Sequence, residues 1–249
     1  MKPTRADNRR EIAYRVSPSR QTRRRAVSEI LLLFLVLFLP GMLVTGEAVD
    51  VHLFDHVEFH VTYALVALPQ IALIVYLIKI GRDMWPPEFG LRRLRLRDLL
   101  YALVILILLY LTLAAVIATA TGLQRLGIEI SAPTGGGFRL TRPELLPLVA
   151  VTSLLTGYRE ELFFRAYMLT RLRQTGVAFP AAVAVSTVLF AVGHLYQGLL
   201  GLAFAAVIGV ILAIAFRRRR SVHPIGLAHA GYNFLTLVFT LAVENTIPS

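Results

Sequence analysis

The chain has 249 residues, of which 56% are hydrophobic and only 16% are charged. Soluble domains carry about a quarter charged residues, so this composition excludes an ordinary soluble domain and predicts a membrane protein. The formal net charge is +11, but Lys and Arg fall in blocks between apolar runs, which is typical of cytoplasmic loops and argues against a nucleic-acid-binding role. Cysteine is absent from the sequence, which excludes disulfides, thiol nucleophiles and thiolate metal sites.

The composition divides the chain into three parts. Residues 1–25 hold nine basic and two acidic residues, which predicts a disordered cytoplasmic arm that contacts anionic lipid or only sets the orientation of the chain. No small-residue cleavage site follows the first apolar run, so the first span is predicted to be retained. Residues 26–140 are predicted to form N-terminal transmembrane helices and loops, and residues 141–245 a second helical part with charged residues inside its apolar runs.

Apolar runs of this length predict an all-α, polytopic membrane protein with about seven transmembrane helices. They cover roughly residues 26–45, 61–80, 99–121, 144–169, 177–194, 199–216 and 222–243. With the N-terminus in the cytoplasm, the cytoplasmic segments hold 21 of the 26 Lys and Arg residues and the exterior segments hold three. This asymmetry predicts a cytoplasmic N-terminus. A flexible loop is predicted at Gly135–Gly137.

Three histidines lie at four-residue spacing between the first two spans, at His52, His56 and His60, with Asp55 and Glu58 between them. On a helix they would form one stripe, and imidazole with carboxylate can bind a transition metal. The alternative is a polar exterior cap whose histidines face lipid headgroups. Both readings stay open from the sequence.

The fourth apolar run contains charged residues that are costly in a membrane and therefore predict a functional site. Glu161 and Arg165 are four residues apart, so on a helix they share a face and can pair. Glu160 lies about 100° around the helix from Glu161 and is free to act as a general base. The alternative is a structural network in which these charges and Arg159 satisfy one another.

Two later helices add further polar side chains. His229 and Asn233 share a helix face and could donate hydrogen bonds to a developing oxyanion, or they could join helices as a polar clamp. His194 follows Phe190 by four residues at a helix end, where an interface role is the alternative. Together with Glu160 these groups supply the parts of a water-activating hydrolase. They could also bind Zn²⁺, but the H-E-x-x-H helix of zincins is absent.

The depth of these residues sets a condition on the fold. At 1.5 Å per residue, Glu160 lies about 15 Å and His229 about 10 Å from the cytoplasmic ends of their spans, whereas His194 counts as nearer the exterior. They meet only if the fifth helix begins below the membrane or the turn after it dips inward. Non-helical backbone at depth requires a cavity lined by protein or water.

Three sequence motifs resemble those of one family, in the same order. Glu160-Glu161-Leu-Phe-Phe-Arg165, Phe190-Ala-Val-Gly-His194 and His229-Ala-Gly-Tyr-Asn233 are similar to the EExxxR, FxxxH and HxxxN motifs of the CPBP family (Abi, CAAX proteases and bacteriocin-processing proteins) of intramembrane proteases. The resemblance covers about residues 145–240. It implies a glutamate-dependent endopeptidase that cleaves a membrane-associated protein or peptide.

The resemblance also implies a role for each motif residue. Glu160 would be the general base, His194 would help to activate water, and His229 with Asn233 would bind the oxyanion. Glu161 and Arg165 would support them. Such a mechanism requires no metal, although Zn²⁺ is a less favoured alternative. The expected partners are membrane lipid and the substrate, in the plasma membrane.

Two other functions compete with this one. The first is a non-catalytic immunity or partner-binding protein of the same family, which would use the same polar network as a scaffold. The second is a transporter with Glu160, His194 and His229 as a proton relay. The transporter is disfavoured because the sequence shows neither inverted repeats nor paired broken helices.

Overall fold

The computed structural model describes residues 20–43, 50–81, 86–128 and 138–244. Within these ranges the regular structure is helical, with no strand, which confirms the all-α prediction. Most of the predicted basic arm (residues 1–19) and the Gly135–Gly137 loop lie outside the described residues. The last residues of the predicted arm belong to a helix, because α2 begins at Arg20.

The described helices follow the predicted apolar runs. They are, in chain order, α2 (Arg20–Leu37), α3 (Leu39–Leu43), η2 (Leu53–Asp55), α4 (Val57–Ile80), α5 (Leu96–Arg125), η3 (Pro143–Leu145), α6 (Leu146–Glu161), η4 (Leu162–Leu169), α7 (Thr170–Gln174), α8 (Phe179–Val192), η5 (Leu195–Gln197), α9 (Gly198–Arg219) and α10 (Val222–Glu244).

Among the described residues, four helices are long and apolar enough to cross a membrane. These candidate spans are Val57–Ile80, Leu96–Arg125, Leu195–Arg219 and Val222–Val243. Their length and apolar composition indicate an integral membrane protein. The total of seven spans and the cytoplasmic N-terminus stay predictions.

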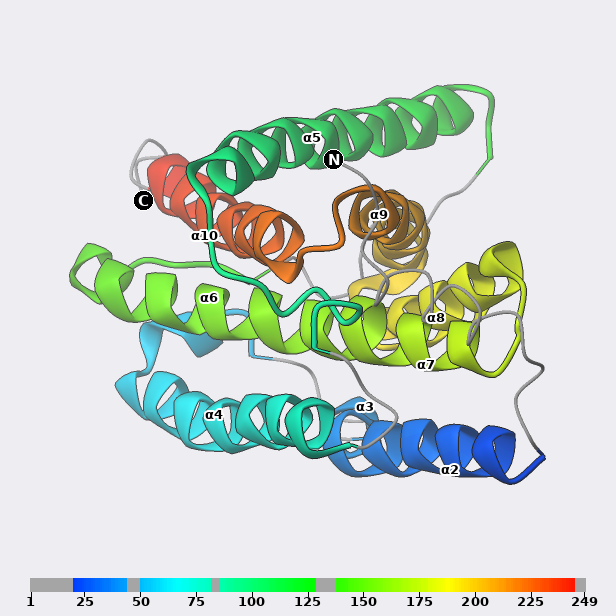
Figure 1. Ribbon diagram of the computed structural model, residues 1–249. Coiled ribbons are helices and arrows are strands. Elements are labelled where there is room, and N and C mark those ends of the chain that lie inside the picture. The colour runs from blue at the N-terminus through cyan, green and yellow to red at the C-terminus, as the bar shows by residue number, and fades with distance from the viewer. Residues whose placement is uncertain (1–19, 44–49, 82–85, 129–137, 245–249) are drawn as a thin grey trace.

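One long helix, formed by α6, η4 and α7 in succession, runs through the centre of the structure. Figure 1 shows it between α4 on one side and α10 with α5 on the other, and α6 contacts both α4 and α10. Its middle part, η4, also packs against α8 and α9. The charged motif of the fourth predicted span therefore lies where most of the helices meet.

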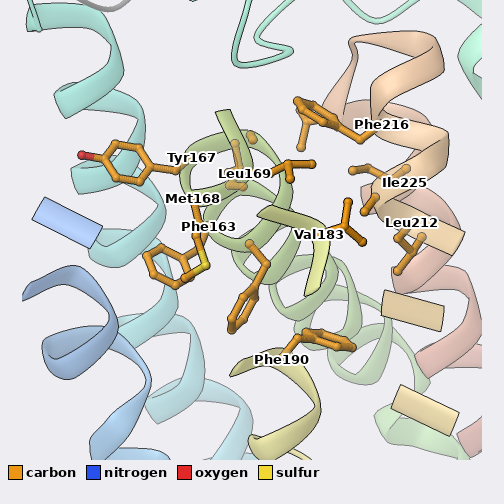
Figure 2. Close-up of a cluster of buried hydrophobic side chains, with 14 of the residues drawn as sticks. Phe163, Tyr167, Met168, Leu169, Val183, Phe190, Leu212, Phe216 and Ile225 are labelled. Carbon is orange, nitrogen blue, oxygen red and sulfur yellow. The ribbon is translucent and has the colours of Figure 1, made fainter. Parts of the chain in front are cut away.

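The backbone of this central helix widens just after the two glutamates. A regular α-helix was expected through residue 169, but η4 is a π-helix of eight residues, all of them buried. Figure 2 shows Phe163 and Tyr167 pointing to one side of the helix, and Val183, Leu212 and Phe216 packed on another. Packing on every side explains the difference, because tertiary contacts outweigh the local preference for the tighter helix. Such π-turns are frequent at functional sites.

Asp55 joins the segment before α4 to the segment before α6. Its carboxylate accepts hydrogen bonds from the backbone and hydroxyl of Thr141 (2.9 and 2.8 Å) and from the backbone of Arg142 (3.1 Å). Burial raises the pKa of Asp55, but these bonds and one from His52 outweigh it and hold the pKa below its ordinary value. Asp55 is thus held ionised at neutral pH and fixes the start of the central helix.

The helical stripe considered for the three histidines is not formed. His52 lies in a turn before η2 and contacts Asp55, whereas His56 lies between η2 and α4 and contacts Asp50. Only His60 is inside α4, where it is buried and its ring nitrogens contact the Thr152 hydroxyl (2.7 Å) and a backbone carbonyl. The described part of the chain contains no group of three or more His, Asp or Glu residues that could hold a metal ion.

Candidate functional site

The site begins with a close approach of α6 and α10. A Cβ atom added at Gly157 would lie 2.7 Å from the backbone nitrogen of Ala230 and 2.8 Å from the carbonyl oxygen of Gly226. Only glycine permits this separation, because real Cβ atoms do not come so near to backbone atoms. The approach lies one helical turn before Glu161 and next to His229, so it brings these two side chains together.

Glu161 is the centre of a buried charged network. Its side chain is fully buried, and its Oε1 accepts a hydrogen bond from Arg165 Nη1 at 3.0 Å. The same oxygen lies 2.9 Å from Nδ1 of His229. An ionised carboxylate only accepts hydrogen bonds, so Nδ1 carries the hydrogen and Glu161 sets the orientation of the ring. The predicted pairing of Glu161 with Arg165 is present in the structure.

Glu160 faces the other nitrogen of the same imidazole. Its Oε2 lies 3.7 Å from Nε2 of His229, which is an ion-pair distance but too long for a hydrogen bond. This oxygen is buried and has no hydrogen-bond partner among the described residues, although the side chain as a whole is 13% exposed. Each glutamate thus has an Oε2 without a hydrogen-bond partner among the described residues, and the two differ in that Glu161 is fully buried and bonded through Oε1, whereas the Glu160 side chain is partly exposed and has only the longer contact with His229.

Phe190 connects the remaining histidine to this network. Its ring centroid lies 4.6 Å from that of His194 and 6.0 Å from that of His229, and the Arg165 guanidinium lies over it at 4.2 Å. Nδ1 of His194 contacts the carbonyl oxygen of Phe190 at 2.8 Å, which leaves Nε2 of His194 for another partner. The ring of His194 also stacks on Tyr196, at 6.2 Å between centroids.

The helix before His194 is shorter than a membrane span. α8 has 14 residues and rises about 21 Å, which is less than the roughly 30 Å of a hydrocarbon core. His194 follows directly after its end and is half-buried, near enough to Glu160, His229 and Arg165 to interact with their charges. The short length of α8 allows His194 to lie near the glutamates, as the predicted depths require.

Asn233 and Arg159 are not bonded to the Glu161 and His229 network in the described structure. Asn233 is half-buried and one turn beyond His229 on α10. Arg159 Nη1 donates a hydrogen bond to Gln70 Oε1 of α4 at 3.2 Å, and its guanidinium lies 4.9 Å from the ring centroid of Phe38. Arg159 thus holds α4 against the central helix and takes no part in the Glu161 network.

Two residues of the site were not identified as functional from the sequence. Phe190 contacts three charged or titratable side chains, and its signal was its place four residues before His194. Gly157 permits the contact of α6 with α10. In the sequence it is marked only as a glycine that lies three residues before Glu160. A glycine in a helix indicates close packing only once the neighbouring helix is known.

Replacing Gly157 with Ala is expected to destabilise the fold by about 1–3 kcal/mol and to lower activity, because the new methyl group must push α10 away from α6. Thermal unfolding in detergent measures the first effect. Gly122→Ala in α5 is the matched control, since a Cβ there meets nothing within 4 Å. Equal melting temperatures for the two variants would contradict the close approach.

The comparison with protein families agrees with the motifs. A family model described as "Type II CAAX prenyl endopeptidase Rce1-like" matches residues 142–235. This range contains all of the proposed site residues and confirms the resemblance to CAAX-protease-like proteins over that part of the chain. No curated protein and no solved structure shows significant similarity to the chain.

Proposed function

On the premise of this match, we propose that the chain is a CAAX-protease-like intramembrane endopeptidase. It would cleave a peptide bond of a membrane-associated protein or peptide. Glu160 would activate the attacking water. The observation that supports this best is the difference between the two glutamates. Glu161 is fully buried and hydrogen-bonded to Arg165 and His229, whereas Glu160 is partly exposed and lies beside the same imidazole without a hydrogen bond. A general base needs such a carboxylate, which a water can reach and which is not held by a hydrogen bond.

In the proposed reaction, Glu160 removes a proton from a bound water as the water oxygen attacks the carbonyl carbon of the scissile bond. The proton passes to the amine nitrogen when the C–N bond breaks, so the glutamate is restored. General-base catalysis of this kind contributes roughly 10²–10⁴-fold in rate. Nε2 of His194 would hold the water, because Nδ1 is already bonded to the carbonyl of Phe190.

The developing oxyanion would be stabilised by His229 and Asn233. Since Nδ1 of His229 is held by Glu161, only Nε2 is available to donate a hydrogen bond to substrate. To donate from both nitrogens the ring must carry two protons, and the neighbouring Glu160 and Glu161 supply the compensating charge. Asn233, one turn along the helix, would supply the second donor.

We further propose that hydrolysis proceeds without a metal. The donor set does not fit Zn²⁺ well, because Glu161 and Nδ1 of His229 are already bonded to each other, and the described residues hold no three-ligand group. The plasma membrane stays the proposed location.

The test is cleavage of a membrane-anchored peptide by the purified protein in proteoliposomes, before and after dialysis against a strong chelator. Activity is expected to be unchanged by the chelator. Loss of stoichiometric zinc together with activity, and its recovery on adding zinc alone, would contradict the metal-free mechanism. No cleavage of any membrane-anchored peptide, in a protein that is folded by thermal unfolding, would contradict the endopeptidase.

A further inference from the structure

A small cavity lies at the N-terminal end of α5. Its lining residues are far in the sequence from Glu160 and Glu161. Its volume is about 40 Å³, which is room for roughly three waters. Five arginines line it with one acidic residue and one serine: Arg92, Arg93, Arg95, Arg97, Arg219, Asp98 and Ser221. Nothing in the proposed peptidase mechanism uses this cavity.

The fold holds the two sides of this cavity together through backbone contacts. The segment before α5 is joined to the turn between α9 and α10 by a hydrogen bond from the Val222 nitrogen to the Gly90 oxygen (3.2 Å). His223 Nε2 also contacts the Arg92 carbonyl at 2.8 Å. Gly90 has a positive φ of 72°, and a Cβ there would lie 2.7 Å from the Phe216 ring. The arginines therefore stand on fixed backbone.

The charges around the cavity favour an anion. The one acidic side chain, Asp98, is buried and accepts a hydrogen bond from the backbone of Arg95 at 3.0 Å, so it is already engaged. The Arg219 guanidinium is held over the Tyr101 ring at 3.5 Å, and its Nε is buried without a hydrogen-bond partner among the described residues. Beside the cavity α5 and α10 begin and α9 ends, so two positive dipole ends and one negative end lie there and the positive potential comes mainly from the arginines.

The position of the cavity indicates where that anion comes from. Three candidate spans end beside it: one begins at Leu96, one ends at Arg219 and one begins at Val222. The ends of spans lie at the level of lipid headgroups. Next to the arginines, Leu96 and Leu100 are exposed by 78% and 63%, which offers an apolar surface for an acyl chain.

We propose that this cavity binds the phosphate group of an anionic phospholipid, whose acyl chains lie along the exposed face of α5. Arginine suits phosphate because its planar guanidinium donates paired hydrogen bonds. Its size admits the phosphate oxygens and leaves the rest of the headgroup outside. Bound lipid would join the start of α5 to the turn between α9 and α10 and so stabilise the bundle. This proposal stands independently of the peptidase activity.

The test is thermal unfolding of the full chain in detergent with added short-chain phosphatidylglycerol, phosphatidylcholine or inorganic phosphate. Phosphatidylglycerol is expected to raise the Tm of the wild type by about 5 °C or more. Arg219→Gln and the more exposed Arg97→Gln should each lose at least about half of that shift. Arg218→Gln is the matched control, because Arg218 is exposed at the same helix end but does not line the cavity, and it should keep the full shift.

Three results would overturn the proposal. An equal shift with phosphatidylcholine would show that negative charge is not recognised. An equal shift with inorganic phosphate alone would identify a free anion in place of a lipid. An equal loss in Arg218→Gln and Arg97→Gln would show diffuse surface charge, and this comparison holds even if Arg219→Gln fails to fold.

Discussion

Glu160→Gln is expected to reduce cleavage of a membrane-anchored peptide by roughly 10²–10⁴-fold, since the amide cannot accept the proton of the attacking water. The fold should be almost unaffected, because the Glu160 Oε2 has no hydrogen-bond partner among the described residues and the replacement keeps the same shape. Cleavage rate and melting temperature should be measured on the same purified sample. A large loss of rate at an unchanged Tm is the signature of a catalytic residue.

Glu144→Gln is the control for this experiment, because Glu144 is exposed at the start of the same helical segment and pairs with Arg142 away from the site. It should keep wild-type activity. Full activity in Glu160→Gln would contradict the proposed base. If the protein instead confers immunity that survives loss of both Glu160 and His229, the non-catalytic alternative is favoured.

Glu161→Gln is expected to lower the free energy of unfolding by about 3–5 kcal/mol. Its main effect is thus on stability, in contrast to that of Glu160→Gln. The reason is the fully buried Arg165, whose guanidinium would lose its one carboxylate partner in the described structure and remain charged in the core. His229 would also lose the acceptor that orients its ring. Thermal or denaturant unfolding in detergent measures the loss, and cleavage should fall together with it.

A double variant separates the charge from the packing. In Glu161→Gln with Arg165→Met, the unpaired buried charge is absent, so the double variant is expected to be more stable than Glu161→Gln alone. The difference is the interaction energy of a double-mutant cycle. A loss below about 1 kcal/mol in the single variant would contradict a buried, ionised pair.

Local spacing in the sequence predicted those features that depend on one helix at a time. The four-residue interval of Glu161 and Arg165 predicted their contact, and the structure shows it at 3.0 Å. Apolar runs predicted an all-α chain with long membrane helices, and the described residues confirm that class. The three motifs located the residues that the family match contains. For the contacts within one helix, the regular helix period determines which residues share a face, so their spacing in the sequence is enough to predict them.

Contacts between distant helices could not be predicted in this way. The sequence paired His229 with Asn233 on its own helix, whereas the structure places its imidazole between Glu160 and Glu161 of another helix. That contact depends on the approach of two backbones at Gly157, which is visible only when α10 is in place. The three early histidines likewise do not form the stripe that one continuous helix would give, because a turn and a short helix precede α4.

By itself, the amino-acid sequence determined that this is a helical membrane protein, which residues are candidates for its site and which of them pair within one helix. Only the tertiary structure decided which glutamate is hydrogen-bonded and fully buried, that a 14-residue helix brings His194 near them, and that distant arginines share one cavity. The physical reason is the range of the interactions. Helix geometry follows from neighbours in the chain, but partners across a bundle follow from side-chain volume and from how closely backbones can approach.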